Sequence, residues 1–97
     1  MFYFIEAMIE AGTDMGLSLE QAHQLAVATF VGASALAQDS PETPDVLRER
    51  VTSKGGTTFA ALSVLQENQV KAQFVRAMQA ARQRAVELGN EFGGAPG

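Results

Sequence analysis

Hydrophobic residues recur at helical spacing along almost the whole chain, and no stretch alternates as a strand would. In the first segment the apolar positions share one helical face, whereas Glu6 and Glu10 lie on another. In the last segment Val70, Phe74 and Met78 begin a long apolar stripe. The pattern predicts an all-α protein, a bundle of about five helices. The expected helices cover residues 2–15, 19–38, 44–51, 57–67 and 70–90.

Several helix ends carry local signals. Gly16 is a typical residue just past a helix end, because glycine readily takes the left-handed conformation needed there. Ser18 and Gln21 match a capping box, in which each side chain accepts from the other residue's backbone N–H. Thr43 suits an N-cap, and Pro44 suits the first helical position.

The segment at residues 26–37, AVATFVGASALA, contains only two polar residues, Thr29 and Ser34. A helix that is apolar on every side is normally buried. A chain of 97 residues offers little with which to surround it. We interpret helix 19–38 as the core of an oligomer, the alternative being the middle helix of a bundle made by one chain.

Composition narrows the function. Ninety-seven residues suffice for one domain. The chain has no Cys and one His, so we expect no metal site. No apolar run reaches the ~20 residues of a membrane span, and no membrane association is expected. The net charge of −4 argues against nucleic-acid binding. A cytoplasmic location is the default expectation for a chain without Cys.

Charge is divided unevenly between the two halves. Residues 1–47 contain seven acidic residues and no Lys or Arg, whereas residues 48–97 hold all seven basic residues and four acidic ones. Solvated helix faces account for such a pattern. The alternative is that the two halves meet across an interface, within one chain or between two.

The stretch VTSKGGTTFAAL, residues 51–62, interrupts the helical pattern. Gly55 and Gly56 fit poorly inside a helix, so the stretch is a plain helix break or a ligand-binding turn. In the second case the N–H groups of Gly56, Thr57 and Thr58 stand at a helix start, where they favour a carboxylate or phosphate. The hydroxyls of Ser53 and the two threonines add further donors.

The stretch RVTSKGGTTFAALSVLQ, residues 50–66, resembles the signature of pyrroline-5-carboxylate reductases, V-[ST]-S-P-G-G-x-T. Upstream, FYFIEAMIEAGTDMGLS and ETPDVLRERV are similar to other parts of that family's C-terminal domain. The resemblance covers nearly the whole chain in order. It implies a C-terminal dimerisation and substrate domain at residues 1–90, interlocked with a second copy, and a flexible tail at residues 91–97.

Two departures from the family pattern stand out. Lys54 occupies the position of the usual Pro before the glycines, which loosens the turn and adds a charge expected to help attract an anionic substrate. The family's N-terminal Rossmann domain is missing, so we expect this chain to be a fragment that binds no cofactor and has no activity alone.

The resemblance implies an oxidoreductase of proline biosynthesis that reduces 1-pyrroline-5-carboxylate to L-proline with NADPH or NADH. The sequence does not distinguish the two cofactors, nor a dimer from a higher oligomer. By the resemblance, Ser53 and the N–H groups of Thr57 and Thr58 hold the substrate carboxylate. The Thr58 hydroxyl, the catalytic group, bonds the ring nitrogen. Gly55 and Gly56 let the ring approach the backbone.

Two alternatives stay open. One is the helical dimerisation domain of another nicotinamide-dependent dehydrogenase, in which the SxGGTT turn is not expected. The other is a helical interaction module without a ligand, for which L-proline has no effect on the melting temperature.

Overall fold

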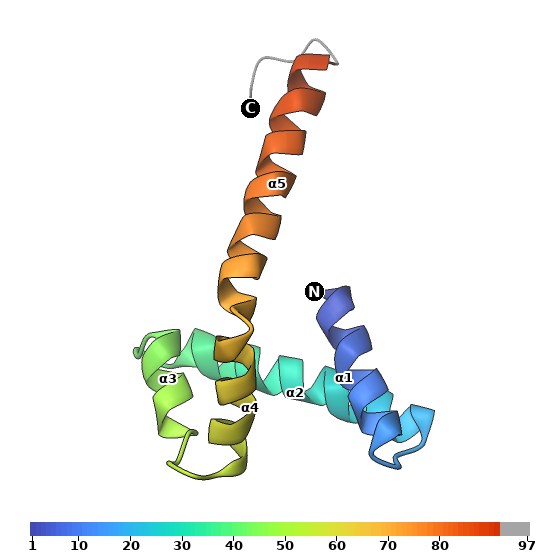
Figure 1. The fold of residues 1–97 in the computed structure, drawn as a ribbon, viewed down its shortest axis with the longest axis vertical. Helices are drawn as coiled ribbons and strands as arrows, with labels where there is room; N and C mark the ends of the chain where they lie inside the picture. The colour runs from blue at the N-terminus through green and yellow to red at the C-terminus, as the bar shows by residue number, and fades with distance from the viewer. Residues whose placement is uncertain (92–97) are drawn as a thin grey trace. The chain divides into compact units, whose positions relative to one another are not determined.

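The computed structural model describes residues 1–91, which fold into five helices and no strand (Figure 1). The helices are α1 (Phe2–Asp14), α2 (Leu19–Asp39), α3 (Pro44–Arg50), α4 (Thr57–Glu67) and α5 (Val70–Glu91). The predicted all-α class with five helices is confirmed, and each end lies within one residue of its predicted position. Of the predicted tail, Glu91 ends α5, and the rest lies outside the described residues.

The chain divides into two compact units. The first unit, Met1–Arg50, contains α1, α2 and α3, and the second, Val51–Gly97, contains α4 and α5. In the described residues no helix is both long and apolar enough to cross a membrane.

In the first unit α1 folds back against α2 (Figure 1). Gly12 of α1 makes the close approach possible, since a Cβ built on it would lie 3.0 Å from the Cβ of Ala22. Ala22 and Ala26 are 2% and 3% exposed, and they are the only buried residues in the part of the chain described. The core of this unit is therefore a narrow seam of small residues.

The turn between α1 and α2 carries the predicted signals. Gly16 adopts φ +104°, a left-handed conformation that a residue with a Cβ rarely takes. The capping box is present: the Gln21 N–H donates to the Ser18 Oγ at 3.1 Å, and the Ser18 N–H donates to the Gln21 Oε1 at 3.1 Å. Local chemistry thus fixes where α1 ends and α2 begins.

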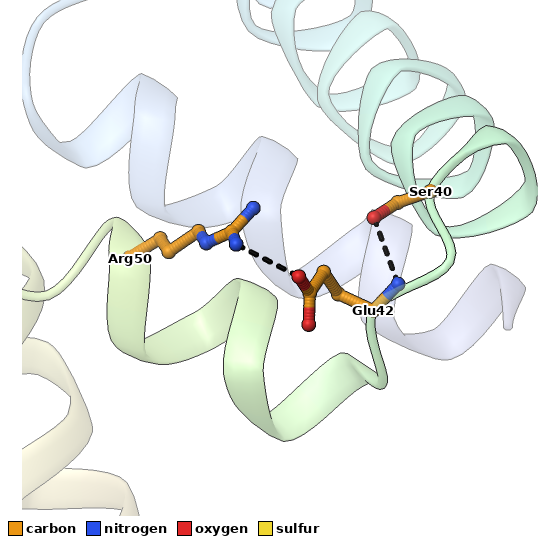
Figure 2. A network of polar contacts seen from close by, with 3 residues as sticks. All are labelled: Ser40, Glu42 and Arg50. Atoms are coloured by element: carbon orange, nitrogen blue, oxygen red, sulfur yellow. Dashed lines mark hydrogen bonds and ion pairs between the residues drawn. The ribbon is translucent and has the colours of Figure 1, made fainter.

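Polar contacts shape the link between α2 and α3 (Figure 2). The Glu42 N–H donates to the Ser40 Oγ at 3.1 Å, and the Arg50 guanidinium at the end of α3 reaches the Glu42 carboxylate at 2.9 Å. The Leu47 N–H donates to the Thr43 carbonyl. This is the bond expected from the residue that directly precedes a helix starting at Pro44. The Arg50 and Glu42 side chains are 60% and 38% exposed, so water screens the ion pair and it adds little stability.

In the second unit α4 leads into α5 through a sharp break. The Asn68 side chain and N–H both donate to the Val64 carbonyl, and Gln69 takes φ 55°. From there α5 continues away from α4 as 22 residues (Figure 1). None of its described side chains is buried.

The helix expected to be buried, residues 19–38, is largely uncovered in this chain. Leu25, Val31 and Leu36 of α2 are 56%, 63% and 64% exposed. Neither α1 nor α3 covers them. Exposed apolar surface of this kind is unfavourable in water and marks a site of interaction.

Candidate functional site

The residues singled out in the sequence form a tight turn followed by the start of α4. The Gly56 N–H donates to the Ser53 carbonyl at 2.9 Å, which closes a four-residue β-turn. Gly55, the third residue, has φ +79°, the value that a type II turn requires there. Lys54 is then the second residue, where such turns favour Pro. The turn itself explains why a proline suits this position.

Gly56 is the N-cap of α4. Its backbone is extended, with φ −86° and ψ −179°, and its carbonyl accepts from the Ala60 N–H at 3.1 Å. Glycine has no side chain with which to cap the helix, and no side-chain cap bond is present. The N–H groups of Thr57, Thr58 and Phe59 lie in the first turn, where no carbonyl of the helix can accept from them.

The structure places Ser53 directly over Gly56. A Cβ built on Gly56 would lie 2.5 Å from the Ser53 Oγ and 3.2 Å from the Ser53 carbonyl oxygen. Only a residue without a side chain leaves the Ser53 hydroxyl where it is. The two predicted site residues are therefore brought into contact, and the hydroxyl stays close to the start of α4.

One detail of the predicted donor set is corrected. The Gly56 N–H, expected to face a ligand, donates within the turn to Ser53 and has no second proton to offer. The Phe59 N–H takes its place as the third amide of the first turn. The predicted set of amides began at Gly56, whereas the free amides of α4 begin at Thr57, so Phe59 was left out.

The remaining predicted residues lie on the same segment. Thr57 is exposed and Thr58 is half-buried, at the first and second positions of α4. No acidic residue occupies the first turn of α4. With the positive end of the helix dipole and with Lys54 two residues before the N-cap, this segment favours an anion.

The described residues offer neither a metal site nor a dinucleotide-binding motif. Among the described residues no three His, Cys, Asp or Glu side chains come together as a metal site. Because residues 1–91 contain no strand and no GxGxxG sequence, they lack the strand–turn–helix that cradles a dinucleotide.

Comparison with known proteins decides the family. Residues 1–88 match the family described as pyrroline-5-carboxylate reductase dimerisation. The chain belongs to this family. The match spans the turn and both units, and it confirms the resemblance inferred from the sequence.

The curated relatives that this chain matches are longer than the chain. It is 43% identical over 89 residues to a pyrroline-5-carboxylate reductase of Corynebacterium melassecola. The aligned residues make up 92% of this chain and 33% of that protein. The chain is 42% identical over 92 residues to the Pseudomonas aeruginosa reductase, covering 95% of this chain and 34% of that protein. The chain thus spans about a third of the length of these relatives.

A solved structure agrees with the fold. The chain is similar to the pyrroline carboxylate reductase of Plasmodium falciparum, crystallised with NADP bound, with a TM-score of 0.80 and 32% identity. The match covers 82% of this chain and 32% of that one. Membership of the dimerisation family favours the reductase over the domain of another nicotinamide-dependent dehydrogenase.

Proposed function

We propose that this chain is the dimerisation and substrate domain of a pyrroline-5-carboxylate reductase, which reduces 1-pyrroline-5-carboxylate to L-proline with NADPH or NADH. The observation that carries the proposal is the turn from Ser53 to Gly56, which opens into the uncapped first turn of α4. The family match and the reductases found among the relatives support it.

The substrate carboxylate is held by the start of α4. The N–H groups of Thr57 and Thr58 have no partner within the helix, so they are ready to donate to carboxylate oxygens. The Ser53 hydroxyl, fixed over Gly56, donates from the side. Charged acceptors strengthen such bonds to roughly twice the strength of neutral ones.

The Thr58 hydroxyl is the group that acts on the reacting bond. It donates to the ring nitrogen, which polarises the imine and supplies a route for its proton. Gly55 and Gly56 carry no Cβ, so the ring can approach the backbone of the turn. A binding site at a helix start suits a small ring that carries a carboxylate, such as 1-pyrroline-5-carboxylate.

The nicotinamide cofactor belongs to another part of the full enzyme. A bound cofactor supplies the hydride, but the described residues of this chain do not offer a dinucleotide cradle. We infer that the isolated chain binds no NADPH or NADH and does not turn over pyrroline-5-carboxylate. A cytoplasmic location is part of the same proposal.

The chain forms a homodimer, and α2 lies at its centre. The exposed Leu25, Val31 and Leu36 of this helix supply the apolar surface that a second copy covers. Small residues along the same helix, including Gly32 and Ala33, permit close approach of helices. A higher oligomer built from such dimers is compatible with the same surface.

Calorimetric titration with L-proline tests the substrate site. Wild-type protein is compared with Thr58→Val, which removes the hydroxyl, and Thr58→Ser, which keeps it. We expect binding that weakens about tenfold in Thr58→Val, as for a lost hydrogen bond to a charged ligand, and that is largely kept in Thr58→Ser. Equal binding by all three proteins contradicts the role of the Thr58 hydroxyl. No binding by the wild type contradicts the substrate site and leaves an interaction module without a ligand.

A further inference from the structure

The charge division noted in the sequence becomes two defined surfaces in the structure. Glu6, Glu10 and Asp14 stand four residues apart on α1, so they form one row, here called the acidic row. All three side chains are exposed, and within residues 1–91 none forms an ion pair. Like charges at this spacing repel each other, so the row costs stability unless a cation covers it.

The opposite charge lies on α5. Lys71 and Arg82 are eleven residues apart, about three turns, so they point within about 20° of one direction. Both are exposed, and neither pairs with an acid of the described chain. We call them the basic pair. Arg84 differs, because Glu87 and Glu91 of the same helix already meet it at 3.2 and 3.8 Å.

Exposed apolar side chains accompany both charged surfaces. Val75 and Val86 follow the members of the basic pair by four residues each, on the same side of α5, and are 47% and 41% exposed. Tyr3 precedes Glu6 by three residues and is 77% exposed. Each surface therefore combines charged side chains with exposed apolar side chains.

The two surfaces are also similar in length. From Glu6 to Asp14 the acidic row spans ~12 Å, and the basic pair spans ~16 Å at the rise of an α-helix. Two cations at this spacing can each meet a carboxylate of the row. The opposite sign and the similar length make the basic pair a suitable counterpart of the acidic row.

We propose that the basic pair of α5 in one copy docks on the acidic row of α1 in a second copy. The inference rests on the proposed homodimer and adds which elements meet. Two-fold symmetry forms the contact twice, since each copy contributes one acidic row and one basic pair. The charges favour this arrangement over one in which identical helices face each other.

Charge reversal in two separate chains tests the contact. One variant carries Glu6→Lys and Asp14→Lys, another carries Lys71→Glu and Arg82→Glu, and a third combines all four changes. Sedimentation equilibrium gives the Kd of each dimer, and circular dichroism checks the fold. We expect each two-site variant to raise Kd at least about tenfold, because four ion pairs per dimer become repulsive.

Mixing distinguishes the possible partners. An equimolar mixture of the two variants restores tight dimers, because both contacts in the mixed dimer are again attractive. The combined chain is restored as well. Recovery in the combined chain but not in the mixture overturns the proposal, since the surfaces then meet within one chain. The milder Glu6→Gln and Lys71→Gln serve where a reversed variant fails to fold.

The control variant is Asp39→Lys with Glu67→Lys, which changes the net charge as much as the acidic-row variant but lies off both surfaces. Equal Kd values for the control and the reversed variants overturn the docking proposal and leave the homodimer intact. A wild-type chain that sediments as a monomer overturns the homodimer itself.

Discussion

Ser53 and Gly56 hold each other in place: the Gly56 N–H donates to the Ser53 carbonyl at 2.9 Å, and the Ser53 Oγ occupies the space where a Gly56 side chain would be. The hydrogen bond closes the turn, and the missing side chain lets the serine hydroxyl reach the start of α4. The proposed ligand binding and the turn geometry thus depend on the same two residues.

Gly55→Ala is expected to destabilise the turn. Nothing lies within 4 Å of the added Cβ, but φ +79° is left-handed, and alanine costs about 1–2 kcal/mol there. Chemical denaturation measures the loss of unfolding free energy. Gly89→Ala, inside α5 and also without neighbours, is the control and is expected to stabilise by about 1 kcal/mol. Equal effects of the two substitutions would refute the left-handed requirement.

Lys54→Pro is expected to stabilise the protein by about 0.5–1 kcal/mol, because proline suits the second position of a type II turn and restricts the unfolded chain. Thermal unfolding checks the gain, with Lys54→Gln as the control that removes only the charge. L-proline affinity separates the two roles. An unchanged affinity in both variants shows that the Lys54 charge takes no part in drawing the ligand in.

Ser18→Ala is expected to remove about 1 kcal/mol of stability, because both halves of the capping box are lost. Ser34→Ala, an exposed position in the middle of α2, is the matched control. It should be neutral or slightly stabilising, since alanine is the better helix former. Denaturant unfolding of both variants checks the difference, and an equal loss in both would contradict the role of the cap.

Thr43→Val is expected to raise the pKa of Asp45. The hydrogen bond from the Thr43 side chain is the main cause that lowers the pKa of this carboxyl below 3.8, with its own N–H and that of Val46 assisting. A depressed pKa stabilises the folded state above 3.8, and this contribution disappears as the pH falls through the folded value. NMR titration of Asp45 measures the change, and Thr43→Ser should retain the low pKa. A pKa that stays low in Thr43→Val contradicts the assignment.

Helix ends could be predicted from the sequence because their causes are local. Gly16, the Ser18–Gln21 pair and Pro44 each act on neighbouring residues, and the structure places all of them as expected. The break near residues 67–69 was also predicted. The left-handed conformation of Gln69, with φ 55°, was not predicted. Glycine and asparagine are the usual residues in that conformation.

The position of the candidate site in the chain could be predicted from the sequence, but its geometry could not. A glycine pair before two threonines indicates a helix start, yet the turn type depends on the φ of Gly55, and the loss of the Gly56 donor depends on one hydrogen bond. The exposure of the apolar side chains of α2 could not be predicted from the sequence. The apolar residues of α2 predict burial, but whether the cover comes from this chain or from another copy is a tertiary property without local cause.

The most direct test of the proposed function is an NMR titration of the amide groups with L-proline. The account predicts that the Thr57, Thr58 and Phe59 amide signals shift together and saturate, whereas the Gly56 amide, which donates to Ser53, moves less. The amide of Leu19, at the start of the capped helix α2, provides the internal comparison and should stay in place. Saturating shifts at both helix starts, or no shift at Thr57 and Thr58, would contradict a substrate-carboxylate site in this turn.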